Sequence, residues 1–255
     1  MQCIIIGKER GGLDMNSPRY IRDVALTLPI SDESYLFGIP AVQHLIANEK
    51  LSIKSPVTFF VGENGTGKST LLEAIAVAYG FNAEGGTKNF QFSTNNSHSE
   101  LYKHLTLMKA AFAKDGFFLR AESFYNVASY VDEVNARDSY GGTSLHRQSH
   151  GESFLALVQN RFQGNGLYIL DEPEAALSPM RLLTLIAEID MLVKNNSQFI
   201  IATHSPILMA YPGAEILEFS ENGVQAVSYK ETEHFQITKN FLENPEIMLR
   251  YLLET

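Results

Sequence analysis

The feature that most constrains this chain is the segment SPVTFFVGENGTGKSTLLEAIAVAYG, residues 55–80. Its first part is apolar, and its last part carries apolar residues at helical spacing and closes on a glycine. Between these parts, the pattern G-x-x-x-x-G-K-[ST] is matched by Gly62, Gly67, Lys68 and Ser69. Because a glycine-rich loop between a strand and a helix is typical of phosphate binding, the segment predicts a strand, a phosphate loop and a helix in that order.

Each part of this phosphate loop (residues 62–70) has a predicted role. The glycines let backbone N–H groups turn inward around phosphates, and the helix N-terminus adds the positive end of its dipole. Lys68 is expected to reach the terminal phosphates, and Ser69 to offer its hydroxyl to magnesium. The residues expected to contact the nucleotide here are Gly62, Glu63, Asn64, Gly65, Thr66, Gly67, Lys68, Ser69 and Thr70.

Three further polar residues follow two apolar strands. Asp171 comes directly after LYIL (167–170), at the strand end where ligands lie in parallel sheets, and can hold magnesium through water. Glu172 is placed to orient or deprotonate an attacking water. His204 follows another apolar strand, in ATHSP (202–206). Alone, such a carboxylate pair is usually a solvated turn and such a histidine is usually structural, but together with a phosphate loop they indicate catalysis.

Composition narrows the class of protein. The chain has 255 residues and is 45% hydrophobic, which is ample for a packed core. Its single cysteine, Cys3, excludes an internal disulfide and a cysteine zinc cluster, and we see no signal peptide or membrane-length apolar run. We therefore expect a cytoplasmic protein. The net charge of -9 argues against a protein that coats nucleic acid, although a local basic groove remains compatible with it.

The rest of the chain alternates apolar runs and amphipathic stretches, which after Pro56 predicts a largely parallel sheet with helices on its faces. Strands are expected at 3–6, 20–28, 117–122, 167–170, 198–203, 214–219 and 224–229, with a short one at 90–92 inside a polar loop at 81–99. Helices are expected at 100–116, 123–136, 152–162 and 180–193, and within 235–254.

The sequence resembles the ABC-type ATPases in its motifs and in their order. These are a phosphate loop, an Asp-Glu pair after an apolar strand, and a histidine after the next strand. That family carries an LSGGQ-like signature shortly before the Asp-Glu strand, and QSHGES (148–153) stands in this place. Ser149 and Gly151 align with the signature serine and second glycine, while His150 and Glu152 replace the first glycine and the glutamine. Alone, this pattern would be a capped helix start.

The resemblance implies an α/β fold in which residues 1–255 form one ABC-type ATPase domain. Its sheet would be mostly parallel, with an N-terminal antiparallel β element and a short helical insertion, the helical and signature sub-region lying at about 99–165. The resemblance also implies ATP and Mg²⁺ as cofactors. Ser69 and Asp171 would hold the metal, and Glu172 and His204 would be catalytic.

In ABC-type ATPases the signature of one subunit closes on ATP held by the other, so the resemblance implies a head-to-tail homodimer with two ATP molecules. Ser149 and Gly151 would then contact the partner's nucleotide. AALSP (175–179) would cross the interface, with Ser178 in place of the usual aspartate. The glutamine that senses magnesium corresponds to either Gln91 or Glu122. The candidates for the aromatic residue that stacks on adenine are Tyr20, Tyr35 and Phe37.

The sequence looks most like compact, stand-alone predicted ATPases near the SMC and RecF-like group, on the evidence of its phosphate-loop run, SHGES and ATHSP. The segment from Ser123 to Ser149 is too short to hold an SMC-type coiled coil. Three functions follow. The favoured one is an ATP-driven dimerising switch on a partner protein, such as a nuclease or another effector in genome maintenance or defence. The altered signature argues against the second, an ABC transporter ATPase subunit. The intact motif residues argue against the third, a non-hydrolysing ATP-binding regulatory module.

Overall fold

The computed structural model describes residues 19–87, 99–121, 124, 129 and 149–253. Its main sheet has six strands in the order β5-β6-β7-β3-β8-β9. These are β5 (Asp115–Arg120), β6 (Gly166–Asp171), β7 (Gln198–Ala202), β3 (Val57–Gly62), β8 (Glu215–Ser220) and β9 (Gly223–Val227). All neighbouring pairs are parallel except the edge pair β8–β9. Every residue of β3, β6 and β7 is buried, which explains their unbroken apolar runs.

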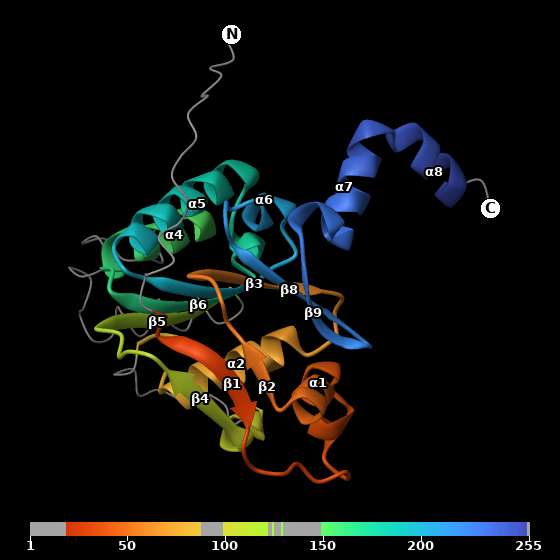
Figure 1. Ribbon diagram of the computed structural model, residues 1–255. Coiled ribbons are helices and arrows are strands. Elements are labelled where there is room, and N and C mark those ends of the chain that lie inside the picture. Colours follow the sequence, from red (N-terminus) through yellow and green to blue (C-terminus); the bar gives the residue numbers. More distant parts are fainter. Residues whose placement is uncertain (1–18, 88–98, 122–123, 125–128, 130–148, 254–255) are drawn as a thin grey trace.

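A second, antiparallel sheet has the order β2-β1-β4. It consists of β1 (Ile21–Leu26), β2 (Lys50–Ser52) and β4 (Leu105–Lys109). Helix α2 (Lys68–Tyr79) lies between this sheet and the main one, and α1 (Pro40–Asn48) lies beside it (Figure 1). Because α2 is covered from both sides, apolar residues occur around most of its circumference, including Leu71, Leu72 and Ile75. The expected N-terminal antiparallel element is therefore confirmed.

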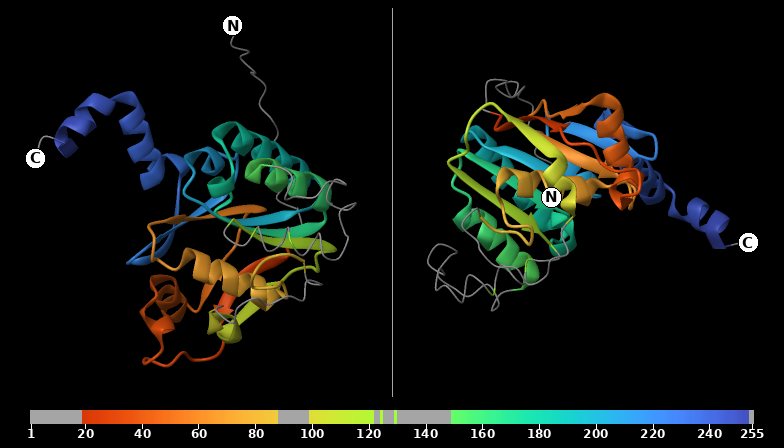
Figure 2. Two further views of the ribbon diagram at one scale, coloured as in Figure 1. Left: turned by 180° about the vertical axis from the view of Figure 1, so that it is seen from behind. Right: turned by 90° about the horizontal axis from the view of Figure 1, so that it is seen from below.

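The opposite face of the main sheet is covered by α4 (His150–Arg161), α5 (Pro179–Lys194) and the short α6 (Pro206–Met209) (Figures 1 and 2). One apolar core fills the space between these helices and the sheet, and a second core surrounds α2. The mostly parallel α/β architecture predicted from the sequence is thus confirmed. The sequence motifs follow β3, β6 and β7. Because these strands are parallel, the motifs lie together at the C-terminal ends of the strands.

The chain ends in an arm that projects from the body (Figures 1 and 2). A 3-10 helix (Tyr229–Glu231) leads into α7 (Glu233–Glu243), and Pro245 starts α8 (Pro245–Leu253). Neither helix contains a buried residue. The sequence predicted one amphipathic helix here; the structure divides it in two, because proline cannot continue the preceding helix.

The predicted helix at 100–116 is wrong. A 3-10 helix (Glu100–His104) is followed by β4, which pairs with β1 over the register Leu26↔Leu105 to Ile21↔Lys109. The apolar residues do have helical spacing, but Phe112, which would extend that face, is 84% exposed. Pairing with the open edge of β1 stabilises the strand instead. Within the helical and signature sub-region expected at about 99–165, the described residues from Glu100 to Arg120 thus include a 3-10 helix and two strands, while Phe124, Ser129 and α4 are helical.

Helix α1 was not predicted. The expected strands at 3–6 and 90–92 lie outside the described residues, as does the expected helix at 123–136 apart from Phe124 and Ser129. Among the described residues, no helix combines the length and the apolar character needed to cross a bilayer.

Candidate nucleotide site

The phosphate loop has the backbone that its glycines predict. Gly62, Gly65 and Gly67 all have positive φ, at 126°, 85° and 93°. A Cβ on Gly62 would lie 2.1 Å from the carbonyl oxygen of Phe219 on β8, and one on Gly67 would lie 2.3 Å from Cγ2 of Ile39. The two glycines of the motif are therefore required both by the backbone conformation and by close neighbours.

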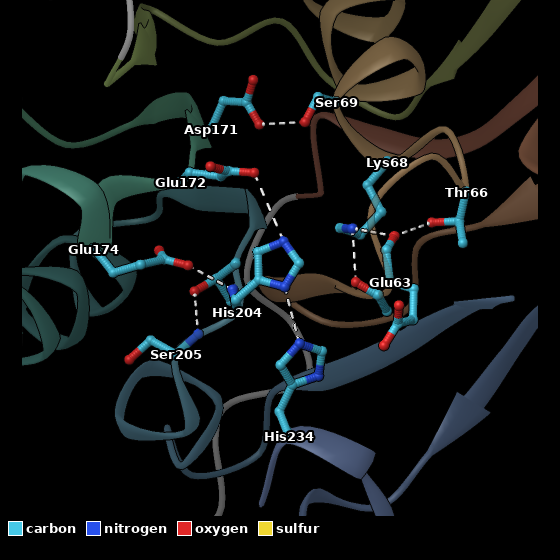
Figure 3. A network of polar contacts seen from close by, with 12 residues as sticks. Glu63, Thr66, Lys68, Ser69, Asp171, Glu172, Glu174, His204, Ser205 and His234 are labelled. Carbon is cyan, nitrogen blue, oxygen red and sulfur yellow. Dashed lines mark hydrogen bonds and ion pairs between the residues drawn. The ribbon is translucent and has the colours of Figure 1, made fainter. Parts of the chain in front are cut away.

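Lys68 begins α2 and is 4% exposed. Its Nζ donates to the carbonyl oxygens of Gly62 and Glu63, at 2.7 and 2.8 Å, so the amine lies inside the curve of the loop (Figure 3). Burial lowers the pKa of Lys68, and the carboxylates of Glu172 and Asp171 oppose that shift. This places a cation under the loop, where it can bind an anion held by the backbone N–H groups.

Ser69 and Asp171 meet, although they are far apart in the sequence. The Ser69 hydroxyl donates to Oδ1 of Asp171 at 3.0 Å, which joins the first turn of α2 to the end of β6 (Figure 3). Asp171 is 6% exposed. The two side chains offer a carboxylate and a hydroxyl oxygen, the donor atoms that Mg²⁺ prefers. They fit a magnesium site that phosphate oxygens would complete.

Arg120 is a residue of this site that the sequence did not reveal. It pairs in register with Asp171 at the end of β5, and its Nε lies 3.4 Å from Oδ2 of Asp171. Its Nη1 lies 2.6 Å from Oε2 of Glu73, a carboxylate on α2 whose other oxygen accepts from the backbone N–H of Ser99. The guanidinium thus holds two carboxylates together. The only sign of Arg120 in the sequence is its place in RAE, at the end of an apolar strand, and this tripeptide matches no motif that we used.

Glu172 and His204 face each other across the ends of β6 and β7. Glu172 has left-handed backbone angles, φ 49° and ψ 52°, an unusual conformation for a residue other than glycine. Its Oε1 lies 3.7 Å from Nε2 of His204 (Figure 3). Both side chains are partly exposed, so a water or a phosphate group can reach them. The structure therefore brings together the two residues expected to be catalytic.

Two other side chains hold His204. The carboxylate of Glu174 accepts from the backbone N–H of His204, and Nδ1 of His204 lies 2.9 Å from Nε2 of His234 on α7. Burial raises the pKa of Glu174. Burial, reinforced by the nearby Lys68 charge, lowers the pKa of both histidines and favours neutral imidazoles. His234 was not predicted from the sequence, because no motif marks α7.

The signature residues have partners inside their own chain. Ser149 donates to Oε2 of Glu152 from both its backbone N–H (3.0 Å) and its hydroxyl (2.6 Å). Arg181 on α5 reaches Glu152 and Ser149 at 3.1 and 3.3 Å. A Cβ on Gly151 would lie 2.9 Å from the carbonyl oxygen of Ala176. Glu152 in the altered signature is thus the carboxylate of a helix cap, and the role of Ser149 and Gly151 toward a partner's nucleotide stays a prediction.

The remaining candidates are scattered. Gln91 and Glu122 lie outside the described residues. Tyr20 is buried and donates to the carbonyl oxygen of Asn196, just before β7 and so at the opposite edge of the sheet from the phosphate loop; it cannot stack on a nucleotide there. Tyr35 is exposed and donates to Ser99, and Phe37 is partly buried. Ser178 caps α5, and its carbonyl accepts from the N–H of Leu182.

A cleft of about 950 Å³ adjoins the phosphate loop, and neither Asp171 nor His204 is among the residues that line it. Residues 62–66 of the loop form one wall, and the turn between β8 and β9 forms another. Gly38 and Pro40 close it from one end, and Ile237 and Asn240 of α7 close it from the other. The phosphate loop therefore borders the cleft through residues 62–66 and contacts Asp171 through Ser69.

Two family models match the sequence. One is described as "AAA domain" and matches residues 42–145, which include the phosphate loop. The other is described as "AAA domain, putative AbiEii toxin, Type IV TA system" and matches residues 143–210, which include Ser149, Asp171, Glu172 and His204. No curated protein matches the sequence significantly.

Solved structures that align with the chain include cbiO1 from Clostridium perfringens, part of the ABC transporter complex cbiONQ. That alignment has 20% identity and a TM-score of 0.48, and it covers 93% of this chain and 100% of that one. The SMC head domain from Thermotoga maritima aligns with 15% identity and a TM-score of 0.44, covering 82% and 99%.

Proposed function

We propose that this chain, which two family models described as AAA domains match over residues 42–145 and 143–210, is a P-loop ATPase domain of the AAA and ABC type. It would bind ATP with Mg²⁺ at the phosphate loop and hydrolyse it to ADP and phosphate. One observation carries the proposal. Lys68 from α2, Asp171 and Glu172 from the end of β6, and His204 from the end of β7 converge at one edge of the sheet, beside a loop whose glycines expose backbone N–H groups. This is the arrangement that phosphoryl transfer to water requires.

The phosphates would lie over the loop, with Lys68 binding the terminal ones. Ser69 and Asp171 would hold Mg²⁺, which neutralises phosphate charge when it is bound. The nucleoside would extend into the cleft of about 950 Å³ beside residues 62–66, which Phe219 and Ile237 line together with five glutamates, Glu63, Glu218, Glu221, Glu231 and Glu233. Of the three aromatic candidates, Phe37 is next to Gly38, which lines this cleft.

Glu172 would orient the attacking water and accept its proton. Its carboxylate is partly exposed at the end of a buried strand, where water can approach it. His204 lies 3.7 Å from that carboxylate and would donate toward the terminal phosphate or the carboxylate. A positioned general base contributes about a hundred- to ten-thousandfold in rate, so the loss of Glu172 is expected to slow hydrolysis far more than binding.

The proposal extends to a homodimer formed around two ATP molecules, which acts as a switch on a partner protein in genome maintenance or defence. The N-terminus of α4 supports it: Ser149 is exposed there, as are His150 and Glu152, and the Ser149 hydroxyl bonds only Glu152 and Arg181 among the described residues. An exposed hydroxyl at a helix N-terminus can contact an anion held by a second subunit. The net charge of -9 does not favour nucleic acid as a ligand.

Calorimetry and sedimentation test the binding and the dimer. Lys68→Ala is expected to weaken ATP binding at least tenfold, because a charge-assisted contact contributes about 1.5 to 3 kcal/mol. Glu172→Gln is expected to bind ATP and to double its mass when ATP and Mg²⁺ are added. Unchanged ATP affinity in the first variant would refute the site, and an unchanged mass well above micromolar protein would refute the dimer.

A mixing experiment tests whether Ser149 acts across the dimer. Ser149→Ala and Lys68→Ala should each be nearly inactive. In a head-to-tail mixed dimer, one site carries both defects and the other carries none, so the mixture should regain activity above either variant alone. If Ser149 only caps α4, Ser149→Ala should instead lose about 0.5 to 2 kcal/mol of stability and keep its turnover per folded molecule.

A further inference from the structure

The imidazole of His204 lies between two groups, one at each ring nitrogen. Nε2 faces the carboxylate of Glu172 at 3.7 Å, and Nδ1 faces Nε2 of His234 at 2.9 Å. The second distance is that of a hydrogen bond, so one of these two nitrogens carries the proton and the other accepts it. Figure 3 shows the three side chains in a line from β6 through β7 to α7.

The surroundings decide which nitrogen carries the proton. If His204 donated from Nδ1, its bare Nε2 would face the Glu172 carboxylate, and two electron-rich atoms would oppose each other. His234 would then carry its proton on Nδ1, which is buried and has no hydrogen-bond partner among the described residues. If His234 donates from Nε2 instead, His204 carries its proton on Nε2, toward the carboxylate. The buried Nδ1 of His234 then carries no proton, and the Nε2–H of His204 faces the carboxylate of Glu172 instead of a bare nitrogen facing it.

His234 is held by the segment that starts α7. Thr232 is fully buried; its hydroxyl donates to the carbonyl oxygen of Tyr229 at 2.8 Å and accepts from the N–H of Phe235 at 3.3 Å. The rings of Tyr229 and Phe235 pack with centroids 4.7 Å apart. These contacts fix the first turn of an otherwise exposed helix, and His234 lies within that turn.

We propose that His234 is a positioning residue that holds His204 in the tautomer with its proton on Nε2, facing Glu172 and the site of the terminal phosphate. This rests on the proposed ATP hydrolysis for its kinetic consequence, but not for the tautomer itself. In this role His234 would not contact the nucleotide itself. It acts through His204, so the first turn of the C-terminal arm is part of the hydrolytic machinery, and displacing α7 from the body would disorient His204.

Nuclear magnetic resonance of the purified full chain tests the tautomer without any turnover. With ¹⁵N-labelled histidine, the ring nitrogens of His204 are identified by their absence from the spectrum of His204→Gln. The expected result is a proton on Nε2 in the wild type at neutral pH, lost or mixed with the other tautomer in His234→Leu. A wild-type proton on Nδ1 of His204, or an unchanged tautomer in His234→Leu, overturns the proposal.

Steady-state kinetics test the consequence with a matched pair. The amide of glutamine can donate from about the position of the His234 Nε2, and leucine has a similar size but cannot donate. His234→Leu is expected to lower kcat about ten- to a hundredfold with little change in KM for ATP, the range found when a group that orients an imidazole is removed. His234→Gln is expected to recover most of that loss. His104→Gln, at a partly exposed histidine that contacts the carbonyl oxygen of Leu28, is expected to match the wild type.

Equal kcat in wild type and His234→Leu, or equal loss in the leucine and glutamine variants with equal thermal unfolding midpoints, refutes a positioning role. If the wild type itself does not hydrolyse ATP, the proposed function fails, and the resonance experiment alone then decides the tautomer. If His234→Leu does not fold, the wild-type spectrum and the glutamine variant still decide it.

Discussion

Removing Arg120 should destabilise the protein markedly. The guanidinium lies 2.6 Å from the carboxylate of Glu73 and 3.4 Å from that of Asp171, and the side chains of the two acids are only 10% and 7% exposed. Arg120→Met keeps an unbranched apolar stem but takes the positive charge away from both. A charged hydrogen bond contributes about 1.5 to 3 kcal/mol, and breaking a fully buried ion pair costs about 3 to 5 kcal/mol.

Because the Arg120 side chain is itself 21% exposed, water reduces the cost, and we expect a loss of about 3 kcal/mol in the free energy of unfolding. For a chain of this size that corresponds to a fall of about 6 to 12 °C in the unfolding midpoint. Urea unfolding followed by far-ultraviolet circular dichroism measures it, since the chain has no tryptophan.

Glu73→Gln supplies the control through a double-mutant cycle. If Arg120 stabilises the protein through Glu73, the double variant should lose less than the sum of the two single losses, with a coupling of about 1 to 3 kcal/mol. A loss below about 0.5 kcal/mol in Arg120→Met, the size of an ordinary surface substitution, would falsify the reasoning. Additive losses would show that Arg120 acts without Glu73.

Two further predictions concern stability. Gly67→Ala should lower the thermal midpoint more than Gly65→Ala. Both positions have positive φ, which costs about 1 to 2 kcal/mol for a residue with a Cβ. Only at Gly67 would the added Cβ also clash, because it would lie 2.3 Å from Ile39. Equal shifts would contradict this. For Asp115, burial raises the pKa, but hydrogen bonds from Tyr168 and Arg161 outweigh it and lower the pKa below 3.8. Asp115→Asn should therefore lose stability at pH 7, and the difference from wild type should shrink as the pH falls through the lowered pKa; urea midpoints at pH 7 and pH 3 check this.

The sequence predicted the parts of the site that depend on local pattern. The phosphate loop needs glycines at particular backbone angles, and Asp171 and His204 each follow a buried strand, so all three can be recognised without knowing their neighbours. Parallel pairing then brings them to one edge, as Asp171↔Ala202 and Phe60↔Ala202 show. The fold class followed from the same alternation of strands and helices.

The failures have a common physical origin in contacts between distant segments. LTLMK became a strand because β1 offers an open edge. Tyr20 lies at the other end of the strands from the phosphate loop because its hydroxyl donates to Asn196, just before β7. Arg120 and His234 belong to the site only through pairing of β5 with β6 and docking of α7. No local pattern encodes such contacts, so a single sequence could not have revealed them.

Phosphate release from ATP by the purified chain, compared between wild type and Glu172→Gln, tests the central claim most directly. The wild type should release phosphate only with Mg²⁺ present, and Glu172→Gln should bind ATP with unchanged affinity while its kcat falls at least about a hundredfold. Magnesium-independent release, or a Glu172→Gln variant with wild-type kcat, would contradict the account of this site.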